Sequence, residues 1–406
     1  MSQLLRTSTR PPAPSYDAVV VGAHPAGAAT AMLLARRGWS TLLLHRNGLS
    51  DDRFVTSPMQ RGAVLLLARW GLLDAVLAAG TAPVRRTVFR HGEEEEVISV
   101  QPSHGVDVLC APSRSVLEPL LVQRAVDAGV DVRLGTTVTD LLWRGGRVAG
   151  VRVAAAGGES RSIGARVVVG ADGARSGIAE RVGAVPSWVG RNASALTCAQ
   201  WSGLAGDAYE WTLRPDACVA VIPVSADRSC VMACASPLRI GPGGPDVLRA
   251  IVEAGSPQLA ARLDKVATPP GWRTWPGRPG HLRPCAGPGW ALVGAAAAAE
   301  DPIGAHGPTA ALRDAELLAR AVGGPEDGDA ALDAALREHR ADRDRRSRPV
   351  LEVLDRLAGH RWDETEVTDL LRRLRSAIAD ETDELASTEP ARPLAAAELD
   401  PPVRSR

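Results

Sequence analysis

The sequence predicts an α/β protein. We expect a discontinuous, Rossmann-like dinucleotide-binding domain that carries an inserted antiparallel β-sheet domain and a C-terminal helical segment. Three glycine-containing segments, each directly after an apolar run, predict the first domain; they are residues 19–27, 167–176 and 290–302. Short alternating segments between residues 195 and 235, separated by Gly, Pro and Asp, predict the inserted sheet.

The order of the expected elements supports this reading. Residues 16–21 form an apolar strand, residues 26–37 a helix that Gly38 ends, and residues 40–44 a second strand. Further helices are expected over 62–79, 115–128, 245–266, 309–322 and 330–357. Further strands are expected over 130–134, 148–155, 162–169, 196–201, 208–213, 218–223 and 229–235.

These elements set the expected domain boundaries. The dinucleotide-binding domain takes residues 16–90, 110–185 and 286–330, and the substrate domain takes 91–109 and 186–285. C-terminal helices follow over 331–385. Residues 1–15 are expected to be a disordered tail and residues 386–406 a flexible one.

Composition excludes several classes of protein. Hydrophobic residues at 45% and charged residues at 23% are typical of a soluble globular chain, and a formal net charge of zero argues against a nucleic-acid partner. No apolar run is long enough to span a membrane, and the first residues lack a signal peptide, so we expect a cytoplasmic protein. The six cysteines show no C-x-x-C spacing, which predicts buried thiols and no metal site. The oligomeric state stays open.

The first glycine segment has the form of a phosphate-binding turn. Gly22 and Gly27 stand at the first and third positions of Gly-x-Gly-x-x-Gly, and His24 replaces the second glycine. At the end of the second strand, where such folds place an acid that binds ribose, the chain has His45. Taken alone, the turn is also compatible with a purely structural strand–turn–helix unit.

The other two segments complete the pattern. The second contains Asp172 and Gly173, and the third contains Gly294, Ala295 and Pro302. Together the three segments resemble the FAD-binding framework of single-component (group A) flavoprotein monooxygenases, over roughly residues 16–360. The resemblance implies a cofactor site that also includes an arginine; its expected members are Gly22, His24, Gly27, His45, Arg114, Asp172, Gly173, Gly294, Ala295 and Pro302.

Two departures from the family pattern put the cofactor in question. The acids that hold the two sugars of the flavin are replaced by His45 and Ala295. Losing two charged hydrogen bonds costs roughly 3–6 kcal/mol, or about two to four orders of magnitude in affinity. The sequence therefore predicts that no cofactor is tightly bound. FAD, used with NAD(P)H, is the alternative.

Three functions follow from these alternatives. The favoured one is a natural-product tailoring enzyme that catalyses a flavin-independent, non-redox cyclisation or rearrangement of a hydrophobic, polyketide-like molecule. The alternative is an FAD- and NAD(P)H-dependent monooxygenase that hydroxylates or epoxidises such a substrate. The third is a non-catalytic paralogue that supports another enzyme. The resemblance points to secondary metabolism only by analogy.

Candidate site residues follow from their positions near these motifs. Arg114, Asp301 and His306 are the catalytic candidates, because they could supply acid, base or cationic groups to a cleft. Arg61, Cys198, Trp201 and Trp211 are the candidates for the substrate pocket. For any one of these polar groups, a structural or solvated role is the competing interpretation.

Overall fold

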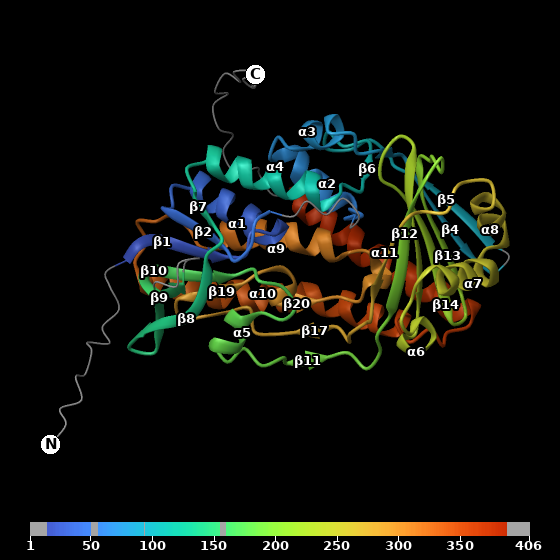
Figure 1. The fold of residues 1–406 in the computed structure, drawn as a ribbon. Coiled ribbons are helices and arrows are strands. Elements are labelled where there is room, and N and C mark those ends of the chain that lie inside the picture. Colours follow the sequence, from blue (N-terminus) through green and yellow to red (C-terminus); the bar gives the residue numbers. More distant parts are fainter. Residues whose placement is uncertain (1–13, 50–55, 93, 155–159, 388–406) are drawn as a thin grey trace, which may run out of the picture.

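The computed structural model describes residues 14–49, 56–92, 94–154 and 160–387. Two lobes lie side by side, and long helices run along both (Figure 1). The expectations for a tail before residue 14 and for residues 388–406 lie outside the described residues. Residues 14 and 15 already belong to the first strand, and the last helix continues to Ser387.

The first lobe is built on a sheet with a parallel core. Its five parallel strands lie in the order β19, β10, β1, β2, β7. They are β1 (Pro14–Val21), β2 (Thr41–His45), β7 (Asp131–Leu134), β10 (Ser160–Gly170) and β19 (Trp290–Leu292). Val19, Val168 and Leu43 are fully buried, as expected for strands covered on both faces. Antiparallel strands extend the sheet: β8 (Thr137–Arg144), β9 (Arg147–Ala154) and β18 (Ala286–Gly287).

Three helices pack together beside this sheet (Figure 1). Helix α1 (Pro25–Arg36) follows β1 and contacts both α4 (Arg114–Asp127) and α9 (Gly307–Ala321). Half of the residues of α1 are alanine or glycine, which lets neighbouring helices approach closely. The fold class expected from the sequence is confirmed.

Two helices expected to be continuous are broken. The segment 62–79 forms α2 (Arg61–Arg69) and α3 (Leu73–Ala78), because Gly71 adopts a φ of 73° between them. The segment 245–266 forms α7 (Pro245–Gly255) and α8 (Pro257–Leu263). Here Pro257 keeps Ser256 out of the helical conformation.

The second lobe is a seven-stranded sheet in the order β16, β12, β15, β14, β13, β4, β5. Its strands are β4 (Arg86–His91), β5 (Glu94–Ser99), β12 (Ala195–Ser202), β13 (Ala208–Arg214), β14 (Ala217–Pro223), β15 (Arg228–Ala235) and β16 (Trp272–Trp275). Neighbours are antiparallel except β13 and β4, which run parallel. Because β4 starts at Arg86, this lobe begins earlier than the expected boundary at residue 91.

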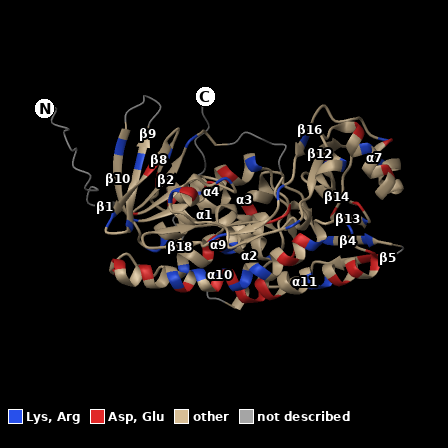
Figure 2. Cartoon of the chain, turned by 90° about the horizontal axis from the view of Figure 1, so that it is seen from below, with Lys and Arg blue, Asp and Glu red and all other residues tan. Residues whose placement is uncertain are grey.

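The remaining short elements lie within the lobes and between them. They are β3 (Pro83–Val84), β6 (Leu109–Cys110), α5 (Gly177–Arg181), β11 (Trp188–Val189), α6 (Pro237–Ile240), β17 (His281–Leu282), η1 (Gly294–Ala296), β20 (Ala298–Ala299) and η2 (Pro302–Gly304). Two long helices, α10 (Asp329–Leu357) and α11 (Glu364–Ser387), pack against each other. Figure 2 shows them along one side of both lobes, with acidic and basic residues interspersed. Within the described residues, no helix has both the length and the apolar character needed to cross a membrane.

Candidate functional site

The turn after β1 is too tight for side chains at two positions. Gly22 has a φ of 112°, and a Cβ there would lie 2.4 Å from the carbonyl oxygen of Ala171. A Cβ on Gly27 would lie 1.8 Å from the carbonyl oxygen of Gly22. Strand, turn and helix therefore pack at a distance that only glycine permits. The first N–H groups of α1 have no partner within the helix, which makes its N-terminus suited to an anion.

A charged cluster lies beside this turn. Arg114, the first residue of α4, has its Nε 2.8 Å from Oε1 of Glu118 and its Nη2 2.6 Å from Nδ1 of His24. The same Glu118 oxygen lies 2.8 Å from His24 Nδ1. A neutral His24 can accept from Arg114 at this nitrogen, and a protonated one can donate to Glu118.

Glu118 is the buried member of this cluster and was missed by the sequence reasoning. Its side chain is 1% exposed. Burial alone would raise the pKa of Glu118, but the hydrogen bond and charge of His24 and the charge of Arg114 lower it below its usual value. The signal that could have found it is its place one helical turn after Arg114.

His45 has a defined partner in the turn. Its Nδ1 accepts a hydrogen bond from the backbone N–H of Ala23 at 3.2 Å, and its ring meets that of His24 edge-on at 5.0 Å. Burial and the neighbouring His24 lower the pKa of His45, so the ring is neutral near pH 7 and its Nε2 carries the proton. The residue that replaces the acid of the family pattern can therefore donate a hydrogen bond, whereas an acid would accept one.

The second motif caps a short helix. Oδ2 of Asp172 accepts the N–H of Ile178 at 3.1 Å, and Oδ1 accepts the hydroxyl of Ser176. Gly173 has a φ of 85°, which explains the glycine that follows the acid. The arrangement gives Asp172 a structural role at the end of β10.

The third motif brings η1 against the start of α1. Gly294 has a φ of 57°, and a Cβ there would lie 3.0 Å from the Cβ of Ala26. Its N–H donates to Asp314 at 3.0 Å. Ala295 is exposed within a run of buried residues and offers only a methyl group where the family pattern has an acid. At position 295 itself, the chain therefore offers a ligand only the polar groups of its backbone.

Asp301 has its carboxylate occupied by the backbone. It precedes Pro302 and caps η2: Oδ1 accepts the N–H of Ile303 at 3.0 Å and Oδ2 accepts the N–H of Ser194 at 2.7 Å. Burial raises the pKa of Asp301 to about 6. Because both oxygens hold loops in place, the geometry favours a structural role over the expected catalytic one.

His306 is fully buried between carboxylates of two different segments. Its Nδ1 lies 3.0 Å from Glu300 and its Nε2 lies 3.2 Å from Glu381 of α11. Burial would lower the pKa of His306, but these two charges outweigh it and raise the pKa to about 10. Glu381 also pairs with the buried Arg313. His306 is thus a cation near neutral pH that ties α11 to the start of α9, and this position argues against its expected role in proton transfer.

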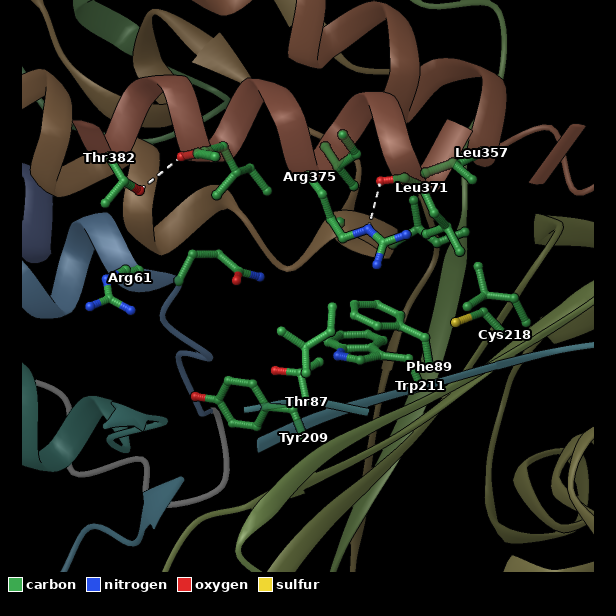
Figure 3. A pocket seen from close by; sticks show the side chains of 18 of the residues that line it. Arg61, Thr87, Phe89, Tyr209, Trp211, Cys218, Leu357, Leu371, Arg375 and Thr382 are labelled. Atoms are coloured by element: carbon green, nitrogen blue, oxygen red, sulfur yellow. Dashed lines mark hydrogen bonds between the residues drawn. The ribbon is translucent and has the colours of Figure 1, made fainter. Parts of the chain in front are cut away.

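A cavity of about 290 Å³ lies between the second sheet and α11. Figure 3 shows its side chains, with the aromatic rings on one wall and α11 above them. The register of β13 and β4 builds this wall, because Tyr209 lies opposite Thr87 and Trp211 opposite Phe89. Further apolar side chains complete it: Leu213 of β13, and Ile98, Cys218, Ile303, Leu357, Leu371, Leu374 and Ile378 from other elements.

The structure separates the expected pocket residues. Arg61 and Trp211 line the cavity. Cys198 lies in the core on the same side of the sheet but does not line the cavity, and Trp201 packs on the opposite side with α7 and α8. Tyr209 was missed, although its alternation with Trp211 along one strand could have placed both on one face.

The donor groups around the glycine turn fit the phosphates of a dinucleotide. The free N–H groups of α1, the Arg114 guanidinium and His24 can all meet an anion, and His45 can donate to a sugar hydroxyl. The turn leaves no room for a Cβ on its glycines. Among the described residues, no cluster of three or more His, Cys, Asp or Glu could hold a metal ion.

Comparisons with known proteins agree with this geometry. A family model described as "FAD binding domain" matches residues 15–353. Digeranylgeranylglycerophospholipid reductase 2 of Methanopyrus kandleri is 30% identical over 201 residues, which cover 48% of this chain and 46% of the reductase. The chain thus spans about half the length of the curated relatives it matches.

Solved structures match over nearly the whole chain. The flavin-dependent brominase Bmp2 has a TM-score of 0.74 and 18% identity, covering 91% of this chain and 93% of the brominase. PqsL of P. aeruginosa, in complex with 2-aminobenzoylacetate, has a TM-score of 0.74 and 19% identity, covering 90% of this chain and 99% of PqsL. At these identities the likeness establishes the fold.

Proposed function

The chain belongs to the FAD-binding domain family, and on that premise we propose that it is an FAD-dependent monooxygenase of a hydrophobic small molecule. NAD(P)H would supply two electrons and O₂ the oxygen: one oxygen atom enters the substrate and the other leaves as water. The family and its flavoenzyme relatives support an oxidoreductase. The choice of monooxygenation among the flavin reactions is our proposal.

One observation carries the proposal. The apolar cavity is lined by Ile303 and Gly304, which directly follow Pro302 of the third motif. The dinucleotide cleft and the cavity therefore meet at one segment, and a molecule in the cavity lies against the end of that cleft. A largely apolar cavity next to a cofactor cleft is the usual arrangement for a small-molecule enzyme.

The chain's own residues have defined tasks in this scheme. Bound FAD would supply the redox chemistry. Arg114 and His24 would hold its phosphates at the start of α1, with Glu118 fixing both side chains, and His45 would hold a sugar hydroxyl. The aromatic wall and α11 would exclude water from the substrate and orient it.

The flavin-independent reading has weaker support than the sequence gave reason to expect. It rested on two replaced acids, yet His45 has a hydrogen-bonding role in the cleft, so only Ala295 leaves a position without a polar side chain. Membership of the FAD-binding family favours the cofactor-dependent alternative. Cyclisation without flavin and a non-catalytic role become outcomes of the experiment below.

The test is an FAD titration of the full-length protein, followed by NAD(P)H oxidation and O₂ uptake in the presence of flat apolar compounds. We expect saturable binding at micromolar FAD, with flavin fluorescence quenched, and substrate-dependent NAD(P)H oxidation. Absence of FAD binding at millimolar FAD would overturn the proposal and revive the cofactor-free step. FAD binding without any NAD(P)H oxidation or O₂ uptake would overturn monooxygenation alone.

A further inference from the structure

We propose that the cavity recognises a flat, uncharged molecule through a carbonyl oxygen, which accepts a hydrogen bond from the hydroxyl of Tyr209. The inference rests on the proposed function, since it names the substrate class of the same cavity. It makes Tyr209 a specificity-determining residue. Aryl ketones and quinones are the chemical classes that meet this description.

The Tyr209 hydroxyl is a buried donor without a partner. The residue is 1% exposed, and its hydroxyl makes no hydrogen bond with any residue that the structure describes. The Met59 backbone lies close by, but the Met59 N–H already donates to the Cys110 carbonyl at 3.1 Å. A buried polar group left unpaired costs about 1–3 kcal/mol, so its presence in the cavity wall indicates a ligand that pairs with it.

Tyr209 acts as a donor throughout the ordinary pH range. Burial holds the pKa of Tyr209 well above its usual value, so the hydroxyl keeps its proton. The proton needs an acceptor, and a carbonyl oxygen offers two lone pairs without a proton of its own. Figure 3 shows the hydroxyl at the end of the aromatic wall, on the side of Arg61.

The shape of the cavity indicates a flat molecule. Phe89 and Trp211 lie opposite each other on neighbouring strands and present their rings to the cavity below α11 (Figure 3). Leu371, Leu374 and Ile378 of α11 face them from the other side. The whole chain has only two tyrosines and two phenylalanines, and one of each lines this cavity. Planar rings gain most from stacking between such walls.

The charges around the cavity indicate a neutral occupant. Of the charged residues that line it, Arg375 is paired with Glu96 at 2.5 Å and lies over the Phe89 ring. Arg61 donates to backbone carbonyls, among them that of Gln101 at 2.6 Å. Asp383 is exposed at the rim. Among the described residues that line the cavity, both arginines already donate to protein oxygen atoms, so a carboxylate placed at the buried end would be desolvated with little compensation.

The test compares 9-fluorenone with fluorene, two flat tricyclic compounds that differ by one carbonyl group. Binding to the full-length protein is measured by quenching of tryptophan fluorescence, and the carbonyl stretch of bound fluorenone by difference infrared spectroscopy. The variants are Tyr209→Phe and, as the matched control, Tyr16→Phe, which changes the chain's other tyrosine on β1. Melting temperatures are measured to check that both variants fold.

We expect the wild type to bind fluorenone about tenfold more tightly than fluorene, and Tyr209→Phe to remove that preference. The carbonyl stretch should lie lower in the wild type and in Tyr16→Phe than in Tyr209→Phe, an effect that a purely structural role would not produce. Equal binding of both probes to the wild type, binding of neither, or an unchanged preference in Tyr209→Phe would overturn the assignment. None of these measurements needs FAD or turnover, so a failed FAD titration and a failed probe experiment are distinguishable.

Discussion

The proposed dinucleotide cleft and the apolar cavity are built in opposite ways. The cleft is formed by the backbone: Gly22 and Gly27 let strand, turn and helix approach within distances that exclude a Cβ, and Gly294 adopts a φ of 57° against the start of α1. The cavity is formed by large side chains, with Tyr209 and Trp211 on one sheet and a helix from a distant part of the sequence above them. A site formed by the backbone keeps its shape when side chains are substituted. In a site formed by side chains, each substitution changes the shape of the site and therefore the ligand it prefers.

The most damaging change should be in the backbone-made cleft. Gly27→Val would place side-chain atoms where even a Cβ lies 1.8 Å from the Gly22 carbonyl oxygen, so the turn cannot keep its conformation. We expect loss of measurable FAD binding together with a fall of several degrees in melting temperature. The control is Gly271→Ala, where a Cβ meets nothing within 4 Å. Normal FAD affinity in Gly27→Val would show that the cleft is not held by this contact.

The stability of the contact between the cleft and α11 should depend on pH. His306 binds carboxylates from the cleft side, Glu300, and from α11, Glu381, and its pKa of about 10 exceeds the unfolded value of 6.5. The protonated imidazole therefore contributes stability that is fully present below about pH 6.5 and is lost as pH rises through 10, amounting to a few kcal/mol at most.

Chemical unfolding at pH 6, 8 and 10 measures this effect in the wild type and in His306→Gln. The variant should be less stable at pH 6 and should lose less stability between pH 6 and 10. Equal slopes in the two proteins would mean that other groups control the pH dependence.

A smaller effect is expected from the side chains of the cleft. Arg114→Ala removes the cation beside the proposed phosphate site and leaves Glu118 buried with less compensation. Losing one charge-assisted hydrogen bond should weaken FAD binding by about 10- to 150-fold, measured by equilibrium titration. Arg124→Ala, near the C-terminal end of the same helix, is the control. An unchanged dissociation constant in Arg114→Ala would show that the phosphates lie elsewhere.

What the sequence predicted follows from the same contrast. The glycines at 22, 27 and 294 predict the cleft from sequence alone. Steric limits on the backbone act locally, so they appear as a pattern of glycines in the sequence. The pairing of His24 with Glu118, and of His306 with Glu381, could not be predicted, because these partners are far apart in sequence and meet only through packing. Trp201 shows the opposite error: its residue type suits a pocket, but its place in the strand directs it to the other face.

The position of α11 has a consequence for how such a protein can change. One wall of the cavity is a single continuous stretch of sequence, held to the first lobe by His306 and Arg313 through Glu381. Exchange of residues 364–387 between homologous genes would replace seven of the nineteen residues that line the cavity in one event and leave the sequence of the first lobe unchanged. Substrate preference in proteins of this design can therefore diversify by recombination as well as by point mutation.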